Sequence, residues 1–173
     1  MLLIAALIQP VVEAPADVLQ TPAGGAAVVL LFTSTDCPIS NRYAPEVRRL
    51  AKTFSARGVV FRVIYPGHAG SDAALRDHLA SFGYADVMEP YRDSRLGIAK
   101  KVGATITPEA VVLVRGRVVY RGRIDDRQVD LGVERPSPAS HDLADALASA
   151  LAGRPIAHPV TQAVGCFIAD LAR

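Results

Sequence analysis

The sequence predicts an α/β protein in which a central mixed β-sheet is flanked by helices on both faces. Apolar runs of strand length alternate with segments of helical spacing, and a late pair of strands is joined by a tight turn. Alternating strands and helices imply a largely parallel sheet, and the late turn adds antiparallel strands at one side. The chain has 173 residues, half of them apolar, which is enough for the core of one domain.

The N-terminal residues 1–20 are treated separately from this domain. Leu2–Ile8 resembles the apolar middle of an export signal, although no positive charge precedes it and no clear small-residue cleavage site follows. The segment is therefore a signal peptide or an apolar first strand. We favour the signal peptide, which implies a periplasmic or secreted protein, and a cytoplasmic protein is the alternative.

The first strand of the domain is expected at residues 26–34, where AAVVLLFTS follows a loop rich in proline, alanine and glycine. An unbroken apolar run is typical of a strand that is covered on both faces. The next segment, 38–57, has helical spacing of its apolar residues. Gly58 follows it at the position where glycine commonly ends a helix.

Two further pairs of strand and helix are expected downstream. In chain order they are a strand at 59–66, a helix at 72–82, a strand at 87–90 and a helix at 94–102. Gly83 ends the first of these helices, and Asp93 or Ser94 can accept hydrogen bonds from the exposed amides of the second.

The last part of the domain is expected to be a hairpin and a helix joined by a loop. The segments are a hairpin at 109–124 that turns at Gly116, a polar loop at 125–140 and an amphipathic helix at 141–153. Residues 21–153 are thus predicted to form one domain. Residues 154–173 are a C-terminal tail that contains Cys166.

Charge and apolar patterning exclude two classes of protein. The net charge is only +2 and the basic residues are scattered, which argues against binding of nucleic acid. The apolar stretches fall short of the ~20 residues that cross a bilayer, so no membrane span is expected. The histidines lack metal-ligand spacing and are expected at the surface or at helix ends, so no metal or cofactor is predicted: His68, His78, His141 and His158.

Cys37 lies where the first strand ends and the first helix begins. Unpaired amide groups and the positive end of the helix dipole stabilise a thiolate at such a position. The placement therefore predicts a reactive cysteine. The neighbouring Asp36 opposes ionisation unless a cation such as Arg42 neutralises it, and the sequence leaves the net effect open.

The segment FTSTDCPISNRYAP, at 32–45, resembles the active-site segment of thioredoxin. Cys37 then stands at the first cysteine of the CxxC motif, Ser40 at the second, and Pro45 at the proline that kinks the helix. In GATITPEAVVL, Thr107 and Pro108 stand where thioredoxin-like proteins place a cis-proline beside the reactive sulfur. We therefore expect a cis Thr107–Pro108 bond.

Taken together, DCPISNRYAPE, ITPEAVVL, YRGRIDD and the late GC are similar to the redoxin branch of the thioredoxin superfamily, and more narrowly to peroxiredoxin-like proteins of the AhpC/TSA group. The resemblance spans about 27–151 and the late cysteine. It implies a thioredoxin-like fold and a thiol oxidoreductase with one active-site cysteine, in a CxxS motif. Leu30 replaces a proline of the peroxiredoxin motif, and the peroxide-activating arginine is missing near Thr107, so efficient peroxide reduction is not expected.

The resemblance also implies a role for Cys166, because a distant tail cysteine commonly resolves the oxidised cysteine in peroxiredoxin-like proteins. Two other interpretations stay open. A static disulfide between Cys37 and Cys166 would stabilise the fold by roughly 4 to 5 kcal/mol in the chain-entropy model. Cys166 could instead be an unpaired, buried thiol that packs as a small apolar residue.

Other polar residues are weaker candidates for the site. Asn41 and Tyr43 could face the sulfur, but Tyr43 is better interpreted as a core residue with its hydroxyl at the edge. Glu109 could accept a proton from Cys37, although a solvated or ion-paired carboxylate is the simpler interpretation. Asp125 and Asp126 are expected to bond local amides in a turn.

Three functions fit these residues. The first is a thiol oxidoreductase in which Cys37 attacks a disulfide or is oxidised, with Thr107 and Pro108 opposite, acting on protein or small-molecule thiols and disulfides. The second is a non-catalytic scaffold that binds a peptide at the cis-proline groove. The third is a copper-binding module similar to the Sco chaperones, with Cys37, Cys166 and His158 as ligands. The oligomeric state is left open.

Overall fold

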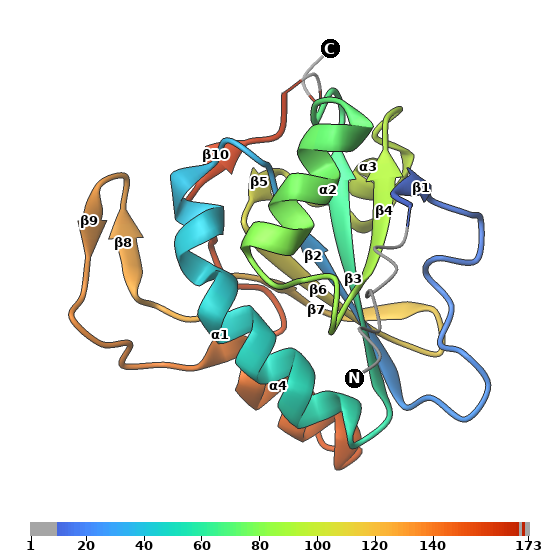
Figure 1. Ribbon diagram of the computed structural model, residues 1–173. Coiled ribbons are helices and arrows are strands. Elements are labelled where there is room, and N and C mark those ends of the chain that lie inside the picture. The colour runs from blue at the N-terminus through green and yellow to red at the C-terminus, as the bar shows by residue number, and fades with distance from the viewer. Residues whose placement is uncertain (1–9, 170, 172–173) are drawn as a thin grey trace, which may run out of the picture.

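The computed structural model describes residues 10–169 and 171. The export-signal interpretation of Leu2–Ile8 concerns residues outside this range. A six-stranded sheet forms the centre, in the spatial order β1-β4-β3-β2-β6-β7 (Figure 1). These strands are β1 (Val12–Glu13), β2 (Ala27–Phe32), β3 (Val59–Pro66), β4 (Glu89–Asp93), β6 (Glu109–Val114) and β7 (Arg117–Gly122).

The strand directions confirm a mixed sheet. β1, β4, β3 and β2 run parallel. At one side of the sheet, β6 pairs antiparallel with β2, and β7 pairs antiparallel with β6. The helices that connect and cover the sheet are α1 (Pro38–Ser55), α2 (Asp72–Ser81), α3 (Gly97–Val102) and α4 (Asp142–Leu151). The remaining strands are short: β5 (Ile106–Thr107), β8 (Gln128–Asp130), β9 (Val133–Glu134) and β10 (Cys166–Phe167).

The central strand β2 is buried at every position, as its unbroken apolar sequence predicts. Alternate side chains point to opposite faces, so Val29 and Leu31 join one core cluster while Val28 and Leu30 join the other. The first cluster contains side chains of α1, α2 and α4, and the second contains side chains of α3. Helices therefore cover both faces of the sheet.

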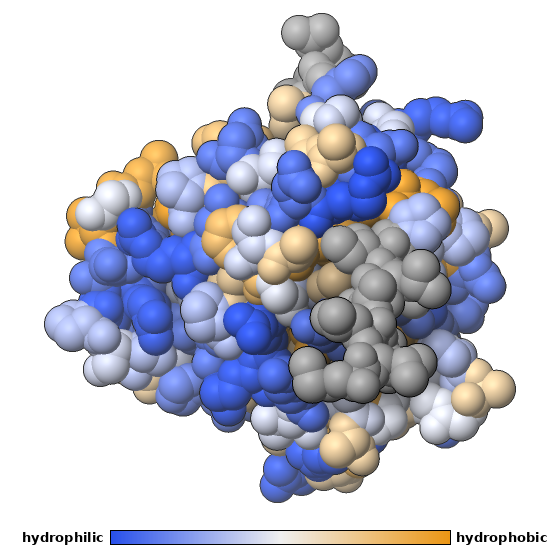
Figure 2. Space-filling view, viewed as in Figure 1, coloured by the Kyte–Doolittle hydropathy of each residue, from blue (hydrophilic) through white to orange (hydrophobic). Residues whose placement is uncertain are grey.

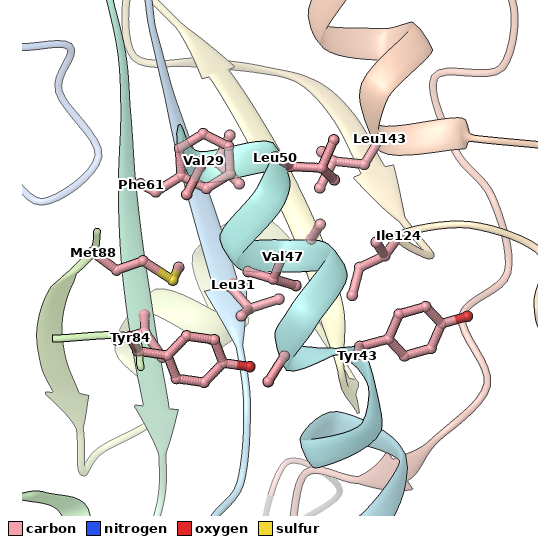
Figure 3. Close-up of a cluster of buried hydrophobic side chains, with 14 of the residues drawn as sticks. Val29, Leu31, Tyr43, Val47, Leu50, Phe61, Tyr84, Met88, Ile124 and Leu143 are labelled. Carbon is pink, nitrogen blue, oxygen red and sulfur yellow. The ribbon is translucent and has the colours of Figure 1, made fainter. Parts of the chain in front are cut away.

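Helix α1 packs on the first face through side chains spaced three and four residues apart. Tyr43, Val47, Leu50 and Phe54 are all buried. Figure 3 shows Val47 beside Leu31 of β2, and Leu50 beside Leu143 of α4. Burying each of these aliphatic side chains fully contributes about 1.5 to 3 kcal/mol, so this packing fixes the position at which α1 begins.

The largest differences from the predicted boundaries are in β4 and α3. β4 occupies Glu89–Asp93 rather than 87–90, and α3 begins at Gly97 rather than 94. The reason is the Asp93 carboxylate, which accepts hydrogen bonds from the amides of Ile98 (3.1 Å) and Ala99 (2.8 Å) across the intervening turn. Asp93 is thus the residue that caps the helix, as one of the two predicted alternatives.

The loop predicted at 125–140 contains a small hairpin, β8–β9, which the sequence analysis missed. Its three apolar side chains, Val129, Leu131 and Val133, are 47–63% exposed, so they form no inward-facing pattern. Figure 2 shows the resulting apolar patch over this hairpin. An ion pair between Arg42 of α1 and Glu134 (2.9 Å) ties the hairpin to the first turns of α1.

The C-terminal tail folds back across the sheet. Val160 forms a parallel bridge with Arg121 of β7, and β10 pairs antiparallel with β5 (Figure 1). Gly122 allows this close approach, because a Cβ atom there would lie 2.1 Å from Thr161 Oγ1. Within the part of the chain that the structure describes, no helix combines the length and apolar character needed to cross a membrane.

Candidate active site

Cys37 occupies the N-cap position of α1, at the end of the loop that follows β2. Its backbone is extended (φ −84°, ψ 108°) and Pro38 takes the first helical position, where the missing amide hydrogen is no loss. The residue is only 1% exposed. The sulfur therefore lies at the positive end of the helix dipole, as predicted, but under a cover of other residues.

The Thr107–Pro108 peptide bond is cis, as the sequence analysis expected. It directs the Thr107 carbonyl oxygen toward the cysteine, and Cys37 Sγ donates a hydrogen bond to this oxygen over 3.2 Å. Glu109, the next residue, holds the loop in place. Its buried carboxylate accepts hydrogen bonds from the amides of Thr105 (2.8 Å) and Ile106 (3.3 Å) and lies 3.6 Å from Arg121.

Glu109 therefore has other partners, and it makes no hydrogen bond to Cys37 through which it could accept a proton. It is buried and ion-paired, which agrees with one part of the simpler interpretation and not with a solvated carboxylate. Burial raises the pKa of Glu109, while the hydrogen bonds from the two amides and the positive charge of Arg121 lower it. Its role in the structure is to shape the turn before the cis peptide.

Cys166 of β10 reaches the same place from the tail. Its sulfur lies 2.6 Å from Cys37 Sγ, closer than two unbonded sulfurs normally pack and longer than the S–S bond of about 2.05 Å. Both cysteines are free thiols in the structure. Cys166 is paired with Thr107 across the short β10–β5 ladder, so the cis-proline loop determines where this sulfur lies.

The two thiols are electrostatically unequal. Burial opposes ionisation of Cys37, but hydrogen bonds from Cys166 and from the side chain and amide of Ser40 stabilise the thiolate, and its pKa lies below the ordinary value. Burial, the hydrogen bond to Cys37 and the negative charges of Cys37 and Asp36 raise the pKa of Cys166. The pair thus favours an anion on Cys37 and a proton on Cys166.

Ser40 has a function here that the sequence analysis did not assign. It is 1% exposed, and its buried hydroxyl has no hydrogen-bond partner among the described residues, so this hydroxyl is free to donate to a Cys37 thiolate, whose pKa it lowers. The side chain therefore stands beside the thiolate instead of the second cysteine of a CxxC motif. The signal was present in the sequence, because the first turn of a helix puts positions 37 and 40 on the same side.

A small cavity of about 250 Å³ opens beside the cysteines. It is lined by Cys166 and Thr107, by the loop that follows β2, by the loop 66–69 and by the tail 167–169. Cys37 is not among its lining residues, so the space gives access to Cys166 rather than to Cys37. Three larger hollows among the described residues, of about 330, 490 and 1020 Å³, are lined by neither cysteine nor histidine.

Two predicted neighbours of the sulfur, and the cation suggested for Asp36, have other partners. Asn41 donates to the Thr35 carbonyl (3.1 Å) rather than facing Cys37. The Tyr43 hydroxyl donates to Asp125 Oδ1 (2.6 Å), so Tyr43 is a core residue with a bonded hydroxyl, as the alternative interpretation stated. Arg42 pairs with the β8–β9 hairpin and does not neutralise Asp36, which accepts a hydrogen bond from the Ser34 hydroxyl instead.

His78 was expected at the surface or at a helix end; it lies in the last turn of α2 but is only 5% exposed. Its Nε2 lies 2.8 Å from Asn41 Oδ1, and its Nδ1 lies 2.8 Å from the Tyr65 hydroxyl. Since the Asn41 amide nitrogen already donates to Thr35, its Oδ1 is the acceptor, so His78 donates from Nε2 and accepts at Nδ1. This neutral imidazole supports the loop that carries Cys37, and no sequence pattern around position 78 indicates it.

The predicted copper ligands do not assemble. His158 is exposed, and among the residues that the structure describes no three His, Cys, Asp or Glu side chains are placed to share a metal ion. Cys37 and Cys166 are brought together without a third ligand of this kind. The site has the geometry of a dithiol.

Comparison with known proteins gives matches among solved structures alone, since no family model and no curated protein matches the chain. An uncharacterized conserved protein from Geobacillus kaustophilus has 27% sequence identity and a TM-score of 0.69, over 83% of this chain and 76% of that one. A secreted disulfide oxidoreductase from Mycobacterium tuberculosis, described as homologous to E. coli DsbE, has 18% identity and a TM-score of 0.53, over 84% of this chain and 98% of its own.

A third similar structure is a thiol:disulfide interchange protein of the thioredoxin family from Chlorobium tepidum. It has 18% identity and a TM-score of 0.52, over 73% of this chain and 81% of that one. At these identities the similarity establishes the arrangement of strands and helices. The chain therefore has the thioredoxin-like fold, which it shares with solved thiol–disulfide oxidoreductases.

Proposed function

We propose that the protein is a thiol–disulfide oxidoreductase of the redoxin type, in which Cys37 is the nucleophilic thiolate and Cys166 resolves the intermediate. The observation that carries the proposal is the approach of the two sulfurs to 2.6 Å beside the cis Thr107–Pro108 peptide. Segments that are 129 positions apart in the chain meet at this contact. A buried thiol pair of unequal pKa is the arrangement that disulfide exchange requires.

In the first step, the Cys37 thiolate attacks one sulfur of a substrate disulfide. A new S–S bond joins Cys37 to the substrate, the substrate's own S–S bond breaks, and the departing thiolate takes up a proton. The lowered pKa of Cys37 supports this role, because the thiolate rather than the thiol is the nucleophile.

In the second step, the Cys166 thiolate attacks Cys37 Sγ and releases the second substrate thiol. The substrate has then gained two electrons, and the protein holds a Cys37–Cys166 disulfide. Cys166 can ionise at this stage because Cys37, once bonded to the substrate, no longer carries the negative charge that raises the pKa of Cys166. External thiols reverse the two steps and restore the dithiol.

The substrate proposed is a disulfide or thiol of a protein or small molecule rather than a peroxide. In the resemblance to peroxiredoxins, Ser34 stands at the position of a threonine three residues before the reactive cysteine that helps to activate peroxide, but its hydroxyl donates to Asp36 and not to Cys37. No arginine side chain of the described residues hydrogen-bonds to the Cys37 sulfur. We further propose an exported location, which the secreted Mycobacterium tuberculosis protein of similar fold supports.

Trapping of the intermediate tests this function. Cys166→Ser protein incubated with a small aromatic disulfide should accumulate a mixed disulfide on Cys37, because the resolving thiol is gone. The wild type should instead release two equivalents of aromatic thiol and acquire an internal disulfide. Mass spectrometry of acid-quenched samples reads both results.

Cys37→Ser is the matched control and should form no mixed disulfide at Cys166 at neutral pH. If Cys166 in Cys37→Ser formed a mixed disulfide as fast as Cys37 does in Cys166→Ser, the assignment of Cys37 as the nucleophile would be contradicted. An unlabelled Cys37 in Cys166→Ser would contradict the catalytic function and favour a peptide-binding scaffold.

A further inference from the structure

We propose that residues 163–168 form a detachable strand that covers Cys37, and that Gly165 is the positioning residue that allows this strand to dock. The proposal rests on the thiol chemistry proposed above and adds the step that controls access to it. While the strand is docked, Cys166 is the only thiol that the Cys37 sulfur can reach for thiol–disulfide exchange. An external disulfide reaches Cys37 after the strand has left.

The first support is the difference in exposure of the two sulfurs. Cys37 is 1% exposed, whereas Cys166 is half-buried and lines the neighbouring cavity. Disulfide exchange needs direct contact between the attacking sulfur and the sulfur attacked. In the docked arrangement the sulfur of lower pKa is thus the one that a substrate cannot touch.

The second support is that docking depends on few interactions. The β10–β5 ladder contains two residue pairs, Cys166 with Thr107 and Phe167 with Ile106. Beyond the ladder, the Ile168 amide donates to the Thr105 carbonyl over 2.9 Å. The Thr107 hydroxyl donates to the Cys166 carbonyl over 3.4 Å. Ala163 and Ile168 are buried, whereas the Phe167 side chain is 82% exposed. A segment held by two ladder pairs, two further hydrogen bonds and two buried apolar side chains opens locally more readily than the central sheet.

The third support is the fit of Gly165 against the cis-proline loop. A Cβ atom on Gly165 would lie 2.1 Å from the Thr107 carbonyl oxygen and 2.8 Å from its carbon. These are backbone atoms of the cis peptide. The hydrogen bonds from the Thr105 and Ile106 amides to the Glu109 carboxylate hold this loop in place, so its backbone atoms cannot move aside. The φ of Gly165 lies outside the left-handed region, so its backbone conformation does not require glycine. Glycine is required here because only a residue without a Cβ atom can approach the loop so closely.

Replacing Gly165 by alanine should therefore lift the strand without altering Cys37 or its helix. Gly97 provides the matched control: it also has φ outside the left-handed region, and a Cβ atom there would meet nothing nearer than Asp93 Oδ1 at 3.9 Å. G165A and G97A make the same chemical change, and only the first collides with the cis-proline loop.

The test measures alkylation of Cys37 by iodoacetamide in three proteins that also carry Cys166→Ser, so that Cys37 is the single thiol. At a pH about one unit above the ordinary thiol pKa, the rate reports access rather than ionisation. We expect G165A to raise the rate constant at least tenfold over the Cys166→Ser parent, and G97A to leave it within twofold. Equal rates in all three proteins, or equal acceleration by both substitutions, would overturn the proposal.

A second measurement keeps both cysteines. The Ile168 amide in the reduced protein should be protected from hydrogen exchange in the wild type and in G97A. Its protection factor should be at least tenfold lower in G165A. Undiminished protection in G165A would also overturn the proposal. Failure of the oxidoreductase function looks different: Cys37 would show no thiolate at neutral pH in any variant, while the contrast between G165A and G97A would persist.

Discussion

Ser40 is, after Cys166, the side chain that most lowers the pKa of Cys37. A thiol buried to 1% exposure should resist ionisation, and the Ser40 hydroxyl and amide are among the groups that reverse this tendency. Hydrogen bonds to charged groups contribute about 1.5 to 3 kcal/mol, so one hydroxyl is enough to matter. Sequence comparison with CxxC motifs describes Ser40 as a loss, whereas in the structure its buried hydroxyl has no partner of its own and is available to the Cys37 thiolate.

Ser40→Ala should raise the pKa of Cys37, because the thiolate loses a donor and keeps its burial. The alkylation rate at neutral pH should fall several-fold, and the pH titration of the thiolate absorbance should move to higher pH. Ser55→Ala, at the other end of α1, is the control, since the Ser55 hydroxyl bonds only to the Ala51 carbonyl. An unchanged titration in Ser40→Ala would contradict the role given to this hydroxyl.

His78 links the second helix to the loop that carries Cys37. Burial lowers its pKa to about 4, so it is neutral at physiological pH. Between pH ~6.5 and ~4 the unfolded chain binds a proton at this histidine that the folded chain does not, and the free energy of unfolding therefore falls as the pH falls. The loss should approach roughly 3 kcal/mol at pH ~4.

His78→Gln removes this titration while keeping a polar side chain. Denaturant unfolding at a series of pH values should show a shallower decline below pH ~6.5 in His78→Gln than in the wild type. His68→Gln, at an exposed position, should retain the wild-type decline. Identical pH profiles for the wild type and His78→Gln would show that His78 charges freely in the folded protein.

At the scale of elements, helix ends and short strands were harder to predict than long apolar segments. β2 and α1 were predictable because burial repeats at every position of the strand and on one side of the helix. The start of α3 was displaced by three residues, since its capping carboxylate acts across a turn instead of from the adjacent position. The β8–β9 hairpin was missed because its apolar side chains point outward.

The capping of α3 gives a stability prediction. Asp93→Ala should lower the free energy of unfolding by about 1 kcal/mol, because two amides of the first turn lose their acceptor. Ser94→Ala should change it by less than about 0.5 kcal/mol, since Ser94 bonds only to Glu13 at the surface. Denaturant unfolding of both variants distinguishes them, and equal destabilisation would contradict the assignment of the cap.

For the whole molecule, the site exists because three distant parts of the chain converge. The helix start at Cys37, the cis-proline loop at Thr107 and the tail at Cys166 meet at one end of the sheet (Figure 1). The first two positions were predictable from local sequence and a family resemblance. The contact with Cys166 was open, because the path of a tail without regular periodicity depends on close approaches at glycines such as Gly122 and Gly165.

This convergence predicts a coupling between oxidation and stability. A Cys37–Cys166 disulfide closes a loop of 129 positions, which in the chain-entropy model stabilises the fold by roughly 4 to 5 kcal/mol. The oxidised protein should therefore unfold at a higher denaturant concentration than the reduced protein, and Cys166→Ser should show no difference. Oxidation that leaves the wild-type midpoint unchanged would indicate that the docked tail is strained by the bond.

The most direct test of the central claim is a redox titration of the wild-type protein in buffers of reduced and oxidised glutathione, followed by quenching, alkylation and peptide mass spectrometry. We predict one two-electron transition in which Cys37 and Cys166 pass together and reversibly from free thiols to an internal disulfide. Thiols that stay free at every ratio of the two glutathione forms, or that acquire glutathione separately without forming the internal bond, would contradict the account.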